Sequence, residues 1–192
     1  GFLRVAAATL QTVIADPAAN AAAVLATARE CADEGVGLVV YPELTLTGYS
    51  IEDILLQDTL LDAAEAALAE VVAASADLLP VLVVGLPVRG RNRIHNVAVV
   101  VHRGRLLGAV PKSYLPTYRE FYERRQVGPG DDLHGTIHLA GADVPHLMEV
   151  LETFLASLAA IRARAIVIID EAQSLSPTLL DEVRMLTAFE RD

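Results

Sequence analysis

Two charged residues, Glu43 and Lys112, follow apolar segments that are typical of β-strands. Glu43 comes after residues 36–41, and Lys112 comes after a second strand pattern that ends at Val110. A carboxylate can accept a proton from an attacking group, and an ammonium group can stabilise an oxyanion that develops on a carbonyl. The pair is therefore consistent with hydrolysis of a carbon–nitrogen bond. The same residue types are also common at solvated strand ends, so their spacing alone leaves both interpretations open.

The attacking atom for such a reaction is missing from the sequence pattern. Cleavage of an unactivated amide benefits from a nucleophile, such as the thiolate of a cysteine. The only cysteine in the chain is Cys31. Val24, Ala28 and Cys31 occur at positions i, i+4 and i+7 of a predicted helix, which places them on one stripe. We therefore expect Cys31 to face the core as a small hydrophobic residue rather than to attack a substrate.

Alternating helix and strand patterns must position Glu43 and Lys112. Asp16 and Pro17 predict an N-cap and a first helical turn for a helix that runs to about Gly35. Residues 36–41 are continuously apolar, which predicts a strand buried on both faces. Further strands are expected over residues 3–9, 81–86, 95–101, 105–110 and 136–139, and further helices over 51–56 and 59–79. This order predicts an α/β fold with a mixed sheet and helices on its outer face.

Several short sequence motifs occur in an order that resembles a known family. They are Tyr41-Pro42-Glu43-Leu44, Gly48-Tyr49, residues 51–55, residues 111–116 and residues 118–123. Together they resemble the nitrilase-type glutaminase domain of glutamine-dependent NAD synthetases, and residues 111–126 are the most specific part. The resemblance covers residues 1–143 as a partial domain and implies an α-β-β-α sandwich.

The resemblance implies roles for four residues. It makes Glu43 the general base and Lys112 the oxyanion-stabilising residue, and it places Tyr118 and Glu120 at a pocket for glutamine. In the complete family enzyme, a separate ATP-dependent domain uses the released ammonia to amidate nicotinic acid adenine dinucleotide. The family nucleophile is a cysteine on a later strand, and this chain has no cysteine after Cys31.

The last part of the chain, residues 144–192, has a different pattern. A predicted helix opens at Pro145, and an aliphatic strand over residues 165–169 ends in Asp170 and Glu171. This stretch resembles the Walker B strand and helix of AAA ATPases from secretion and transposition systems, which implies a P-loop-ATPase-type α-β-α fragment and a Mg²⁺-nucleotide role for the two acids. The phosphate-binding Gly-x-x-x-x-Gly-Lys-Ser/Thr loop is missing from the sequence, so ATP hydrolysis is not expected. We place a boundary near residues 141–145 and leave open whether both segments share one sheet.

Composition excludes several partners. The net charge is −10, which disfavours nonspecific nucleic-acid binding, and the chain has no apolar stretch long enough to span a membrane. No signal peptide is recognisable, and a single cysteine fits a cytoplasmic protein. The five histidines show no close pair of the kind found in helical metal sites, so no metal or required cofactor is expected. Exposed strand edges predict a homo-oligomer.

These observations lead to one main hypothesis and two alternatives. The main hypothesis is a hybrid chain, designed or recombined, whose truncated glutamine amidohydrolase half is inactive because the nucleophilic cysteine is absent. The first alternative is a working glutamine amidohydrolase that supplies ammonia for NAD synthesis, with a nucleophile from elsewhere or with direct attack by water. The second alternative is binding of a Mg²⁺-nucleotide through Asp170 and Glu171.

Overall fold

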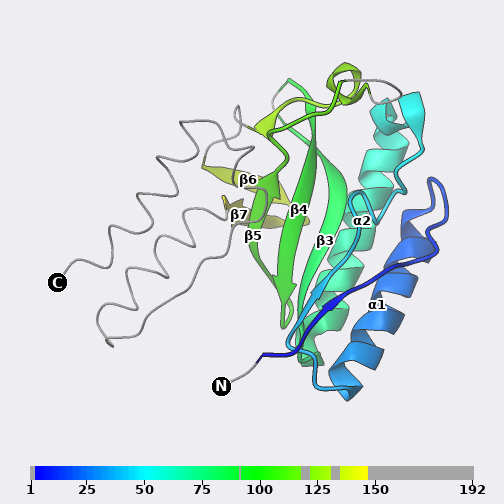
Figure 1. Ribbon diagram of the computed structural model, residues 1–192. Helices are drawn as coiled ribbons and strands as arrows, with labels where there is room; N and C mark the ends of the chain where they lie inside the picture. The colour runs from blue at the N-terminus through cyan, green and yellow to red at the C-terminus, as the bar shows by residue number, and fades with distance from the viewer. Residues whose placement is uncertain (1–2, 91, 118–121, 131–134, 147–192) are drawn as a thin grey trace, which may run out of the picture. The chain divides into compact units, whose positions relative to one another are not determined.

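A five-stranded mixed sheet forms the centre of the computed structural model (Figure 1). The structure describes residues 3–90, 92–117, 122–130 and 135–146, and Gly1–His146 form one compact unit. The strands lie in the order β1-β2-β3-β4-β5; their bounds are β1 Val5–Ala7, β2 Leu38–Val40, β3 Val81–Arg89, β4 Ile94–His102 and β5 Arg105–Pro111. The first three strands are parallel, and β3, β4 and β5 form an antiparallel meander. The predicted α/β fold with a mixed sheet is therefore confirmed.

Two long helices, α1 (Pro17–Asp33) and α2 (Asp58–Ala74), pack side by side in Figure 1. The predicted N-cap of α1 is confirmed, because Asp16 Oδ1 accepts a hydrogen bond from the backbone N–H of Ala19 at 3.1 Å. The described part also contains three short 3₁₀ turns, η1 Glu52–Leu56, η2 Ser75–Asp77 and η3 Glu123–Arg125. Asn20, on α1, is buried and its side-chain amide donates to the carbonyls of Val13 and Leu46 at 2.8 and 3.0 Å. This ties the loop after β2 to α1.

The core lies between the two helices and one face of the sheet. Alternate residues of β3 and β4, such as Leu82, Val84 and Val99, are fully buried there beside Val24 of α1 and Leu68 of α2. The other face of β2 is more open, since Val40 keeps 43% of its surface exposed. The prediction that this strand is buried on both faces was wrong, because α1 and α2 cover one face only (Figure 1).

The hairpin between β4 and β5 forms as predicted. Arg103 and Gly104 both have positive φ, 46° and 75°, which is the backbone geometry that a tight two-residue hairpin requires. The chain also contains a second hairpin, β6 (Thr136–Leu139) and β7 (Ala142–Pro145), whose Ala140 N–H donates to Glu65 Oε1 of α2 at 2.8 Å.

Strand β7 corrects the expectation that a helix opens at Pro145. Pro145 is the last residue of this strand and does not open a helix, and Val144 is fully buried in the core of the first unit. The pairing with β6 explains the difference, because its backbone bonds hold residues 142–145 extended. The remaining predicted elements of residues 147–192 lie outside the described residues.

Within the described part of the chain, no helix has both the length and the apolar character needed to cross a lipid bilayer. The same residues contain no group of three or more histidine, cysteine or acidic side chains arranged to hold a metal ion.

Candidate active site

The loop that carries Glu43 turns sharply after β2 and packs against β3. Tyr41 N–H donates to the Val83 carbonyl at 3.0 Å, and Leu46 N–H donates to the Gly85 carbonyl at 3.1 Å. Between these two bonds, Leu44 adopts a positive φ of 50°, a conformation that a residue with a side chain rarely takes without tertiary support. The loop is therefore fixed at both ends, and the position of Glu43 follows from it.

Gly85 allows this loop to lie against the sheet. A Cβ atom at Gly85 would stand 2.6 Å from the backbone nitrogen of Leu44 and 3.0 Å from the carbonyl oxygen of Pro42. Neither atom belongs to a flexible side chain, so only glycine fits here without moving the backbone. The sequence shows a glycine inside an apolar strand, which is a recognised signal of close backbone approach.

Lys112 is held at the end of β5. The backbone N–H of Lys112 donates to the backbone carbonyl of Asn96 at 2.8 Å, and the backbone carbonyl of Lys112 accepts from the backbone N–H of Gly130 at 2.9 Å. Because β5 pairs with β4 and β4 pairs with β3, the ends of β2 and β5 reach the same region of the sheet. The two residues that the sequence singled out are thereby brought together from 69 positions apart.

An ionic cluster forms where these ends meet. Lys112 Nζ lies 2.8 Å from Glu43 Oε1 and 3.0 Å from Glu123 Oε2. The Asn96 side-chain amide also donates to Glu43 Oε1. The Glu123 side chain is only 11% exposed, whereas those of Lys112 and Glu43 are 27% and 39% exposed. A single ammonium group thus bridges one sheltered carboxylate and one accessible carboxylate.

The cluster fixes the charge of Lys112. Burial lowers the pKa of its ammonium group, but the hydrogen bonds and charges of Glu43 and Glu123 outweigh that effect and raise the pKa above its ordinary value. Tyr49 donates a hydrogen bond to Glu123 Oε1, and its pKa is raised first by burial and then by that carboxylate. Lys112 is therefore charged and Tyr49 neutral across the physiological range.

Sequence reasoning missed two members of this cluster, Asn96 and Glu123. Asn96 is 5% exposed and stands directly before the apolar run Val97–Val101 of β4, where a polar residue is a usable signal. Glu123 belongs to the 3₁₀ turn η3 and has acidic and basic neighbours at nearby positions, so nothing in its spacing separates it from a surface residue.

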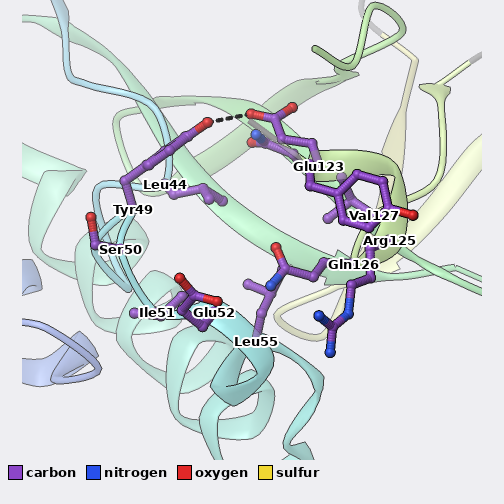
Figure 2. A pocket seen from close by; sticks show the side chains of 12 residues that line it. Leu44, Tyr49, Ser50, Ile51, Glu52, Leu55, Glu123, Arg125, Gln126 and Val127 are labelled. Carbon is purple, nitrogen blue, oxygen red and sulfur yellow. Dashed lines mark hydrogen bonds between the residues drawn. The ribbon is translucent and has the colours of Figure 1, made fainter. Parts of the chain in front are cut away.

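A cavity of about 400 Å³ opens beside the cluster (Figure 2). Asn96 and Glu123 are part of its wall, and Figure 2 shows the Tyr49 hydroxyl directed at Glu123. The rest of the wall comes from η1 with the residues before it and from the segment around η3. Its described lining residues are Leu44, Tyr49, Ser50, Ile51, Glu52, Leu55, Asn96, Tyr122, Glu123, Arg125, Gln126 and Val127.

Cys31 is remote from this cluster along the sheet. It lies near the end of α1 and packs partly buried against the core, as the helical stripe predicted. Its carbonyl accepts from Val36 N–H, just before β2 begins, whereas Glu43 follows the end of β2. Burial, and then the charges of Glu34 and Glu30, raise the pKa of the Cys31 thiol. The thiol is therefore neither placed nor activated for attack at Glu43 and Lys112.

Four predicted site residues lie outside the described residues. Tyr118 and Glu120 belong to the segment 118–121, and Asp170 and Glu171 belong to the segment 147–192. Their assigned roles stay predictions.

Comparisons with known proteins give a family match and several similar sequences. A family model described as carbon-nitrogen hydrolase matches residues 4–174. A glutamine-dependent NAD(+) synthetase from Mycobacterium bovis is 69% identical over 144 residues, and one from Mycobacterium leprae is 63% identical over 145 residues. These stretches cover 75% and 76% of this chain but 21% of each relative, so the chain spans about a fifth of their length.

Solved structures show the same fold. A glutamine-dependent NAD(+) synthetase from Cytophaga hutchinsonii aligns with a TM-score of 0.69 and 25% identity, covering 75% of this chain and 25% of that one. An amidase from Nesterenkonia sp. aligns with a TM-score of 0.58 and 20% identity, covering 94% of this chain and 71% of that one. At 20% identity, the similarity to the amidase concerns the fold alone.

The comparisons do not support the ATPase resemblance or a hybrid origin. The match to the carbon-nitrogen hydrolase model continues past the predicted boundary and includes Asp170 and Glu171. Aliphatic segments followed by two acids occur in unrelated folds, so this short pattern by itself does not identify an ATPase.

Proposed function

Because this chain belongs to the carbon-nitrogen hydrolase family, we propose that it hydrolyses the side-chain amide of glutamine. The ammonia released would serve the NAD synthesis for which its mycobacterial relatives are named. The observation that carries this proposal is the cluster of Glu43, Lys112 and Glu123 beside a cavity of about 400 Å³. We thus favour the working amidohydrolase over the inactive hybrid.

In this proposal Glu43 moves the proton. Its carboxylate is the more exposed member of the cluster and can accept a proton from a group that attacks the amide carbon. Glu43 then returns the proton to the amide nitrogen as the carbon–nitrogen bond breaks, and the products are glutamate and ammonia. The Asn96 amide, which donates to Glu43 Oε1, leaves the other carboxylate oxygen, Oε2, to face the attacking group.

Lys112 stabilises the oxyanion by a change of partner. In the resting site its ammonium group is shared between Glu43 and Glu123. When Glu43 takes up a proton, it loses its negative charge at the moment when the carbonyl oxygen gains one. The ammonium group can then turn from Glu43 to the oxyanion while Glu123 continues to hold it, so little net charge is created in the site.

For the residues present in this chain, we assign the attack to a water molecule. Cys31 is the only cysteine of the chain and lies near the start of β2, away from Glu43. Water attack forms the new carbon–oxygen bond directly, with one water proton on Glu43, and needs no covalent intermediate.

The test is ammonia release from L-glutamine. We expect steady release that Glu43→Gln lowers to the background rate, while Glu70→Gln, at an exposed position of α2, has no effect. A glutamine-mimicking electrophile should leave Cys31 unlabelled. Release that is unchanged in Glu43→Gln, or no release although glutamine binds, contradicts the hydrolysis. Rapid labelling of Cys31 contradicts the assignment of water.

A further inference from the structure

The cavity beside the cluster has polar, apolar and charged lining residues. Asn96 and Glu123 give it a polar end at the ionic cluster. Its apolar wall comes from four residues that are each at most 5% exposed, namely Leu44, Ile51, Leu55 and Val127. It is also lined by two residues of opposite charge, Glu52 and Arg125. A ligand that matches this lining has a polar group for the ionic cluster, a short apolar chain, and both a positive and a negative charge.

Glu52 brings a carboxylate to the cavity in an unusual backbone conformation. Its φ is +50°, in the left-handed region, at the first residue of η1. Strain of this kind persists where the surrounding structure requires it, and it is concentrated at binding sites. Among the described residues, no ion pair and no hydrogen bond involves the Glu52 carboxylate. Its charge is therefore available to a cationic group in the cavity.

Arg125 lies on the other contributing segment, the 3₁₀ turn η3. Its Nη2 atom is 2.6 Å from Asp53 Oδ2, and both side chains are more than half exposed. An exposed pair of this kind contributes little to stability, but it orients the guanidinium group, which keeps further N–H donors for a second carboxylate. In Figure 2 the side chains of Glu52 and Arg125 come from separate segments, with Gln126 drawn between them.

We propose that Glu52 and Arg125 select an α-amino acid amide, Glu52 by binding its α-ammonium group and Arg125 by binding its α-carboxylate. The inference rests on the proposed glutamine hydrolysis. It adds that the two methylene groups of glutamine pack along the apolar wall and that its amide reaches the cluster of Glu43 and Lys112. Both residues are then specificity determinants that act at the end of the substrate remote from the reacting bond.

The test uses four primary amides that differ only in their charged groups. L-glutamine has both groups, glutaric acid monoamide lacks the ammonium group, 4-aminobutanamide lacks the carboxylate, and butanamide lacks both. Binding is measured by calorimetry, and ammonia release is measured in parallel. The variants are Glu52→Gln and Arg125→Gln. The matched controls are Glu70→Gln and Arg124→Gln, because Arg124 is an exposed neighbour that does not line the cavity.

We expect each variant to lose affinity only for compounds that carry its partner group. Glu52→Gln should weaken L-glutamine and 4-aminobutanamide about 10-fold and leave glutaric acid monoamide unchanged, because one charge-assisted hydrogen bond at a partly exposed site is lost. Arg125→Gln should show the reverse selectivity, and the controls should match the unchanged protein.

Two outcomes would overturn the assignment. One is an equal loss for all four amides, or no loss, in both variants. The other is an unchanged protein that binds butanamide as tightly as L-glutamine, or that binds none of the four compounds. Selective binding without ammonia release would instead refute the proposed hydrolysis and leave the roles of Glu52 and Arg125 in place.

Discussion

Replacing Gly85 with alanine tests whether the close packing of the loop on β3 positions Glu43. The new Cβ atom would lie 2.6 Å from Leu44 N, whereas ordinary contact begins at 3.4 Å. The loop that carries Glu43 must therefore move by roughly 0.8 Å, because the atoms in contact are backbone atoms of that loop.

The expected magnitude follows from two opposing effects. Overpacking a well-packed interior lowers the free energy of unfolding by about 1–3 kcal/mol. Replacing glycine by alanine also restricts the unfolded chain, which raises the free energy of unfolding by about 0.4–1 kcal/mol. The free energy of unfolding should therefore fall by about 1–2 kcal/mol, which lowers the melting temperature by roughly 2–8 °C for a chain of 192 residues. A displacement approaching 1 Å at a catalytic group can reduce the rate by about 100-fold, so ammonia release should fall by up to that factor.

Gly37→Ala is the matched control. Its Cβ would meet the side-chain end of Leu3, which is 69% exposed and can rotate away. We expect its unfolding free energy to stay within about 0.5 kcal/mol of the starting protein and its ammonia release to be unchanged. Urea denaturation and the ammonia assay check both variants. The reasoning fails if Gly85→Ala keeps full stability and activity, or if Gly37→Ala is equally damaging.

Three further predictions concern charged and titratable groups. Lys112→Met leaves the sheltered carboxylate of Glu123 without its cation and should lower the free energy of unfolding by about 1–3 kcal/mol in urea denaturation; an unchanged denaturation midpoint would refute this. Burial, and then the nearby Cys31, raise the pKa of Tyr41 above its unfolded-state value of about 10, so its contribution to stability is complete below that pH and is lost as the pH rises above it. Tyr41→Phe should therefore make the loss of stability above about pH 10 less steep. At neutral pH the substitution should lower the free energy of unfolding by about 1 kcal/mol, because the Tyr41 hydroxyl donates to the Val24 carbonyl at 2.8 Å. An equally steep alkaline loss of stability in the variant would argue against this role of Tyr41. Cys31 should react slowly with iodoacetamide at pH 7.5 and faster after unfolding in urea, because its raised pKa keeps it a thiol in the folded protein; equal rates in both states would contradict the partly buried placement.

Local patterns were sufficient for most elements. The Asp16 cap, the turn at Arg103 and Gly104 and the apolar stripe of α1 each depend on residues within one or two turns of the chain, and each formed as predicted. The prediction that the strand at residues 36–41 is buried on both faces was wrong, because burial depends on which elements cover each face of the sheet. Strand β7 was missed for a similar reason, since its pairing with β6 determines its conformation.

The candidate site shows the same division between local and tertiary information. Glu43 and Lys112 could be singled out from the sequence, because each follows an apolar strand and carries a group suited to amide chemistry. Their contact at 2.8 Å, the sheltered carboxylate of Glu123 and the cavity lined by Glu52 and Arg125 depend on the order of the strands in the sheet. Sequence alone determined which chemical groups this protein has and which local elements carry them. Only the tertiary structure decided which of those groups meet, because charges from residues far apart in the chain interact strongly only after the sheet has brought them within a few ångströms.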